Sequence, residues 1–105
     1  MLIPEHKFLV EEVKKVETSR NGKHKFQTII LNKPGYTDEF GEKKGSDDIL
    51  ECTAWNKTID EVPPLLKRGD KVKATLNLQG RKGVEKDTGK EFYTKQLSIY
   101  KISML

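Results

Sequence analysis

The sequence predicts an all-β domain of five strands with one short helical turn between the third and fourth strands. Apolar and polar residues alternate with period two over 49–55 and again over 71–78, so each stretch has one apolar and one polar face. Asn21-Gly22 is typical of a tight hairpin turn between two strands. The connection 56–70 contains two prolines, which leave room for only a short helix.

Length and charge narrow the class of protein. The 105 residues suffice for one domain with a modest core. Hydrophobic and charged residues each make up 34% of the chain, which predicts large solvated loops around that core. Residues 1–66 hold 10 Lys and Arg against 12 Asp and Glu, whereas residues 67–105 hold 10 against 4. A basic segment of this kind favours polyanions such as nucleic acid or an anionic membrane surface.

The sequence also predicts a location. It has no apolar run of about 20 residues that could span a membrane, and its first residues lack the apolar stretch of a signal peptide. The single cysteine, Cys52, lies in an apolar alternation and is expected to be a buried small hydrophobe. We therefore expect a cytoplasmic protein without a membrane partner.

The N-terminal segment fits two structures. Over residues 8–17 valines recur at every third position, as in an amphipathic helix, but the same spacing fits a strand with one extra, bulged residue. The aromatic and β-branched content favours the strand. We expect it to pair through the Asn21-Gly22 turn with a second strand over 24–32, with Phe26 in the core.

Residues 33–48 form the longest predicted loop, rich in glycine and charge. Loops of this length without structure of their own tend to be functional or disordered. Tyr36 and Phe40 are its large apolar residues. They either attach the loop to the body of the domain or contact a ligand.

The helical turn is expected within 56–70. Thr58 and Glu61 have the spacing of a capping box in which Thr58 caps the helix. Gly69 suits a left-handed position after the helix.

The last two strands are joined by a basic loop. The fourth strand is expected to end at Gln79, residues 80–90 form a flexible hairpin loop, and the fifth strand spans 91–102. The alternation of the fifth strand puts Phe92 and Tyr100 on the face opposite its leucine and isoleucine.

This order of elements is that of the OB-fold, a partly open Greek-key barrel, and we expect residues 1–105 to form one such domain. The second half matches a known family in four segments, which occur in the family's order: Thr53-Ala54-Trp55, Leu66 to Val72, Gly80-Arg81-Lys82 and Asp87 to Thr94. On these segments, about half of the chain, the sequence resembles bacterial-type single-stranded DNA-binding proteins. The resemblance implies a protein that coats single-stranded DNA in replication, recombination or repair and that assembles as a dimer or tetramer.

The sequence departs from that family in several places. The helical connection is shorter, Leu76 stands where the family often has glycine, and the loop around Gly83-Val84 lacks the aromatic residue that often stacks on DNA there. The sequence ends without the acidic-tipped tail that the family uses to recruit other replication proteins. This combination suggests a version encoded by a phage or mobile element, acting in the host cytoplasm.

The resemblance and the residue pattern indicate the same binding chemistry. Proteins bind single strands by stacking bases on aromatic rings and by contacting phosphates with cations. Trp55 lies out of phase with the apolar residues of its strand, so it either stacks on a base or covers a second small core, and the resemblance favours stacking. Phe92 and Tyr100 are the next candidates, with packing against the N-terminal segment or a partner subunit as the alternative.

The basic residues complete the predicted site. Lys71 and Lys73 are expected to project beside Trp55, and other cations line the basic loop. Exposed lysines usually form no more than a solvated surface, but beside an aromatic face they are better explained as a phosphate track. The predicted nucleic-acid-binding set is Trp55, Phe92, Tyr100, Tyr36, Phe40, Lys71, Lys73, Arg81, Lys82, Lys86 and Lys90.

Catalysis is not expected. His6 and His24 are isolated, no Cys/His spacing suits a metal, and no glycine-rich phosphate loop is present, so we expect no cofactor and no metal. Three functions remain: a sequence-independent single-stranded DNA-binding protein, an OB-fold binder of RNA or another oligomer, and an interaction module for replication or recombination proteins.

Overall fold

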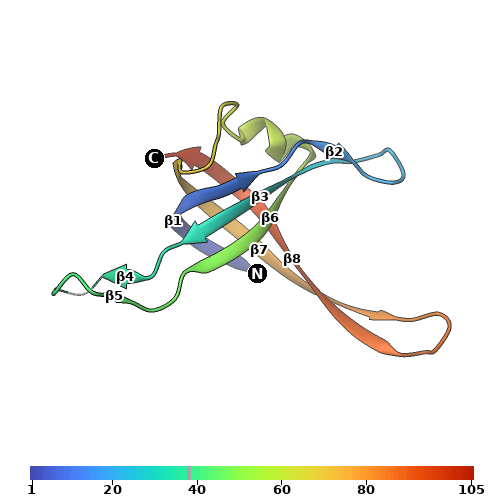
Figure 1. Ribbon diagram of the computed structural model, residues 1–105. Coiled ribbons are helices and arrows are strands. Elements are labelled where there is room, and N and C mark those ends of the chain that lie inside the picture. The colour runs from blue at the N-terminus through green and yellow to red at the C-terminus, as the bar shows by residue number, and fades with distance from the viewer. Residues whose placement is uncertain (38) are drawn as a thin grey trace.

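The strands close into a ring from which several hairpins project (Figure 1). The computed structural model describes residues 1–37 and 39–105, without the side chains of Tyr36, Thr37, Lys43 and Lys44. Its elements are β1 (Leu2–Val13), β2 (Glu17–Thr18), β3 (Lys25–Lys33), β4 (Tyr36–Thr37), β5 (Lys43–Lys44), β6 (Asp48–Trp55), the 3₁₀ helix η1 (Asn56–Glu61), β7 (Lys71–Val84) and β8 (Glu91–Met104).

The main sheet has the order β1-β7-β8-β6-β3-β2, and β1 pairs back onto β3 to close the ring. Strands β6 and β8 are joined by one parallel pair, Thr53 with Ser98, whereas the other neighbours are antiparallel. A five-stranded barrel that is closed at one seam by a single pair is the partly open OB-fold. The predicted fold class is confirmed.

The core lies inside the ring and follows the predicted alternation. On β7 the residues Val72, Ala74 and Leu76 are buried while their neighbours face outward, and Cys52 and Ala54 are buried on β6. Burial raises the pKa of the Cys52 thiol from 9.0 to about 12, with a smaller contribution from the charge of Glu51. The thiol is therefore protonated at neutral pH.

Two bulges explain departures from strict alternation. In β1 the register with β3 shifts between Val10 and Glu12, which confirms a bulged strand and rules out the helical alternative for this segment. In β8, Lys101 pairs with Thr75 and Ile99 pairs with Leu76, so Tyr100 is the extra residue. The bulge at Tyr100 allows Ile99 and Ile102 to face the core although they are three positions apart.

The connections differ from prediction in three places. Within residues 33–48, β4 and β5 pair as a short hairpin, so the loop has structure of its own. The 3₁₀ helix begins at Asn56 directly after β6, and its N-cap, Trp55, makes no side-chain capping bond. Thr58 therefore lies inside the helix and the predicted capping box is wrong.

The third difference concerns the basic loop. Strands β7 and β8 stay paired as far as Val84 with Glu91, so residues 80–84 are strand and the turn is confined to 85–90. Gly89 has a φ of 68°, which suits the predicted turn there. The paired extension projects well beyond the barrel (Figure 1), and the molecule measures 56 × 32 × 20 Å. We call residues 80–95 the arm.

Candidate nucleic-acid interface

A cleft of about 450 Å³ lies where the end of β6 faces the base of the arm. Its lining comes from segments far apart in the sequence, because the barrel brings the β2–β3 turn, the end of β6 and strands β7 and β8 together. The lining residues are His24, Trp55, Asn56, Gln79, Arg81, Gln96 and Ser98. Arg81 supplies positive charge, and none of the seven residues is acidic.

Trp55 forms the aromatic wall of this cleft. It pairs across the sheet with Phe26 of β3, and the two ring centroids are 5.4 Å apart with an angle of 42° between the ring planes. Both side chains are half-buried. Phe26 thus supports the indole from one side while the indole also borders open solvent in the cleft.

Phe26 was expected in the core, and that prediction is wrong. It is absent from the buried cluster that contains Ile29 and Leu31 of the same strand. The reason is period two: residue 26 differs from 29 and 31 by an odd number of positions and so lies on the outer face. The outward position of Phe26 could therefore have been predicted from the sequence alternation.

Asn56 positions the second wall of the cleft. Its backbone is left-handed, with a φ of 48°, which asparagine tolerates better than most residues. Its Oδ1 accepts a hydrogen bond from the Lys25 amide at 3.1 Å, and its Nδ2 lies 3.2 Å from Nδ1 of His24. These contacts fasten the β2–β3 turn to the end of β6. Asn56 was not among the predicted site residues, and His24 was predicted to be isolated.

The arm continues the same outer face beyond the cleft. Arg81 pairs with Thr94 and Gly83 pairs with Phe92, so Arg81 and Phe92 point to one side. A Cβ atom at Gly83 would overlap the Phe92 ring. The absence of a side chain at Gly83 therefore lets the ring pack against the β7 backbone there, and 46% of Phe92 remains exposed.

Other predicted arm residues are arranged differently. Lys82 lies on the opposite side of the arm from Arg81, and its Nζ forms an ion pair with Glu91 at 3.1 Å. Lys86 and Lys90 are exposed in the turn at the tip. Of the four predicted arm cations, Arg81 is the one that lines the cleft.

The prediction that Lys71 and Lys73 lie beside Trp55 is wrong. Both face outward on β7 as expected, but they lie at the end of that strand remote from the arm. With a rise of about 3.3 Å per residue, Lys73 is about 20 Å and Lys71 about 26 Å from Gln79 along the strand. Residues on one face of a strand can lie far apart along it, and β7 is 14 residues long.

Tyr100 and Phe40 are not among the residues that line the cleft. Tyr100 is exposed at the β8 bulge, where the Nζ of Lys101 lies 5.8 Å from its ring centroid. Phe40 is 84% exposed in the β4–β5 hairpin, away from the cleft lining. The side chain of Tyr36 lies outside the described part of the structure.

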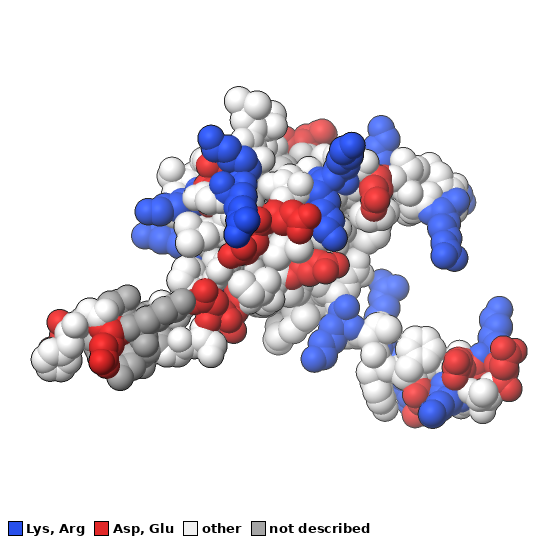
Figure 2. Space-filling model, viewed as in Figure 1, with Lys and Arg blue, Asp and Glu red and all other residues white. Residues whose placement is uncertain are grey.

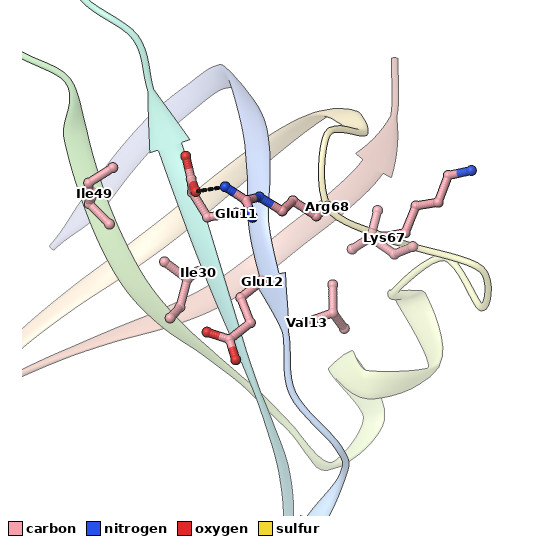
Figure 3. A pocket seen from close by; sticks show the side chains of 8 residues that line it. Glu11, Glu12, Val13, Ile30, Ile49, Lys67 and Arg68 are labelled. Atoms are coloured by element: carbon pink, nitrogen blue, oxygen red, sulfur yellow. Dashed lines mark ion pairs between the residues drawn. The ribbon is translucent and has the colours of Figure 1, made fainter.

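The face formed by β1, β3 and β6 has a different character. A hollow of about 790 Å³ lies there, bordered by Glu11, Glu12, Ile30 and Arg68 among others (Figure 3). Arg68 lies 4.0 Å from Glu11. Figure 2 shows acidic side chains in the middle of this face with basic ones around them. The two carboxylates of this lining are balanced by Lys67 and Arg68, so the hollow lacks the net positive charge of the cleft and is a poorer surface for phosphates.

The described residues contain no group of three or more His, Cys, Asp or Glu side chains arranged to hold a metal ion. Over the same residues, no helix has the length and apolar character needed to cross a membrane.

The closed ring and its extended hairpins define an OB-fold protein. Three solved structures with this fold are single-stranded DNA-binding proteins. The mitochondrial protein of S. cerevisiae has a TM-score of 0.68 and 14% identity, with 100% of this chain and 94% of that chain covered. The small protein of Streptomyces coelicolor has a TM-score of 0.63 and 16% identity, with the same coverage. A deletion mutant of the Thermus aquaticus protein has a TM-score of 0.62 and 18% identity, with 99% of this chain and 51% of that chain covered.

At identities of 14–18% the similarity shows a shared fold. It confirms the sequence resemblance to single-stranded DNA-binding proteins as a resemblance in fold. No profile of a known protein family matches the sequence, and a comparison with the sequences of curated proteins found no match.

Proposed function

We propose that the protein binds single-stranded DNA independently of sequence, with Trp55 as the main stacking surface. The observation that carries the proposal is the cleft, which combines a half-buried indole, an arginine and uncharged amides without a carboxylate. A base stacked on Trp55 would bring its phosphate toward Arg81, which lines the same cleft. The structural neighbours support the proposal, since all three are single-stranded DNA-binding proteins by name.

Stacking supplies affinity without selecting a base. Each base stacked on an aromatic ring contributes about 1–3 kcal/mol, and every base has a π-face that can stack. Phe26 holds the Trp55 ring before the strand arrives, so little side-chain freedom is lost on binding. Phe92 on the arm offers a second ring on the same face, supported by Gly83.

Phosphate contacts supply the salt-dependent part of the affinity. We assign these contacts to Arg81, which lines the cleft, and to the lysines at the tip of the arm, which lie further along the same hairpin. If about four phosphates are neutralised, the logarithm of the binding constant falls with the logarithm of salt concentration with a slope of about −2.8.

The proposed role is to coat and protect single strands during replication, recombination or repair, with no chemistry of its own. We further propose that the protein acts as a homo-oligomer, a dimer or tetramer, as the resemblance implies. Partners among replication or recombination proteins belong to the same proposal.

A second candidate is an RNA-binding OB-fold protein, because stacking on Trp55 would accept ribonucleotides equally well. A competition experiment separates the two. A labelled oligo(dT) bound to the protein is challenged with poly(dT), poly(U) and duplex DNA at the same nucleotide concentration. The proposal predicts that poly(dT) displaces the label and that duplex does not, because duplex bases are unavailable for stacking on Trp55.

Stronger competition by poly(U) would favour the RNA reading, since only RNA has a 2′-hydroxyl to recognise. Equal competition by duplex DNA would contradict stacking altogether and leave only charge attraction.

A further inference from the structure

Four lysines lie together on the outer face of the barrel, at the end of β7 remote from the cleft: Lys7, Lys71, Lys73 and Lys101. Lys7 of β1 is directly opposite Lys73 in the antiparallel ladder, so their side chains leave the sheet on the same side. Lys101 of β8 pairs with Thr75, two positions along the same face of β7. We call these four residues the lysine patch.

The patch is not neutralised by the protein. Among the described residues, none of its ammonium groups lies within ion-pair distance of a carboxylate. Like charges directly opposite each other on adjacent strands destabilise a sheet, and Lys7 and Lys73 are such a pair. The fold thus holds positive charges together at a cost in stability, which an external polyanion would relieve.

The patch and the cleft lie on one continuous face of β7. Between Lys73 and Arg81 the outward positions of β7 are Thr75, Asn77 and Gln79, which are uncharged and small or polar. Their partners on β8 are Lys101, Ser98 and Gln96, which are also free of negative charge. The part of β1 that pairs with β7, residues 2–9, contains one acid, the exposed Glu5, at the irregular stretch between Ile3 and His6.

We propose that the lysine patch is a second contact surface for the same single strand. A strand stacked at Trp55 would continue along the outer face of β7 and place further phosphates at Lys7 and Lys73. This inference rests on the proposed function. It adds the path of the strand over the surface and the minimum strand length that fills both contact surfaces. The patch lies about 20 Å from Gln79, which corresponds to about six nucleotides at ~3.4 Å per stacked nucleotide.

The test compares two lengths of oligo(dT) on the same variants. An oligomer of about 5 nucleotides can occupy the cleft alone, whereas one of about 16 can reach the patch as well, and both lie within the site sizes of OB-folds. The variant is Lys7→Gln with Lys73→Gln. The matched control is Lys15→Gln with Lys67→Gln, which removes the same charge from exposed positions outside the proposed path.

Affinities are measured by fluorescence anisotropy between about 0.1 and 0.3 M salt, where the screening length of about 6–10 Å is shorter than the distance from patch to cleft. For the long oligomer the Lys7/Lys73 variant is expected to lose about 1.4 from the magnitude of the salt slope, or ~0.7 for each phosphate contact. Its affinity for the short oligomer and the behaviour of the control variant are expected to match wild type.

Thermal unfolding gives an independent readout. The Lys7/Lys73 variant is expected to be at least as stable as wild type, because the opposed charges are removed, so weaker binding cannot result from unfolding. An equal loss of affinity for both oligomers, or behaviour identical to the control, would overturn the second contact surface. If wild type binds neither oligomer, the proposed function fails, and the inference with it.

Discussion

Replacing Trp55 with alanine tests the proposed stacking surface. The indole forms one wall of the cleft, so its removal should cost the energy of one stacked base, about 1–3 kcal/mol. At 1.4 kcal/mol for each factor of ten, this corresponds to an increase in Kd of roughly 5- to 150-fold. Trp55→Phe retains a ring and is expected to lose less than Trp55→Ala.

The same substitution also affects stability, and the two effects must be separated. Trp55 contacts Phe26 with a centroid distance of 5.4 Å, and such aromatic pairs contribute about 0.5–1.5 kcal/mol beyond the area that they bury. Phe26→Leu removes the same pair but leaves the indole in place, so it serves as the control. Anisotropy with a labelled oligo(dT) measures affinity, and urea denaturation measures stability. Unchanged affinity in Trp55→Ala, or an equal loss in Phe26→Leu, would refute the stacking role.

Three further predictions concern residues around the cleft and in the core. Gly83→Ala should displace the Phe92 ring from the β7 backbone and weaken oligonucleotide binding by up to the ~1–3 kcal/mol of one stacked base. The melting temperature should stay nearly unchanged, because the arm is exposed. An unchanged affinity in anisotropy titrations would show that Phe92 is not part of the binding site. Asn56→Gly should lower the free energy of unfolding by about 1 kcal/mol, because two exposed hydrogen bonds are lost while glycine still allows the left-handed backbone. Asn56→Ala should lower it further, because alanine disfavours that backbone. A smaller loss for alanine than for glycine in urea denaturation would contradict this prediction. The pKa of the Cys52 thiol is raised from 9.0 in the unfolded chain to about 12 in the fold, so the unfolded chain loses its thiol proton first and the free energy of unfolding falls between pH 9 and pH 12. Relative to Cys52→Ala, wild type should lose about 1.4 kcal/mol of stability between pH 8 and pH 10. Parallel pH profiles of the two proteins would contradict this prediction.

Local patterns predicted most of the strands. The alternation of 71–78 placed Val72, Ala74 and Leu76 in the core, and the Asn21-Gly22 turn was found, with Gly22 at a φ of 71°. The choice of a bulged strand for the N-terminal segment was right because its valines and aromatic residue prefer extended backbone. These signals are local, and period two is strong wherever one face is buried.

The arrangement of the cleft could not be predicted in the same way. His24, Trp55 and Gln79 come together only because the barrel closes, and a single sequence contains no direct measure of that closure. The charged residues of the arm suggested a loop, whereas β7 and β8 pair through it, since cross-strand hydrogen bonds can form without an apolar face.

A tryptophan fluorescence titration with poly(dT) at low and high salt directly tests whether single strands bind by stacking on Trp55. Trp55 is the only tryptophan in the sequence, so its emission reports on the cleft alone. The account predicts that poly(dT) quenches this emission, that salt reverses the quenching, and that duplex DNA does not reproduce it. Binding of poly(dT) at low salt without any change in emission would contradict stacking at Trp55, and no binding at low salt would contradict the proposed function itself.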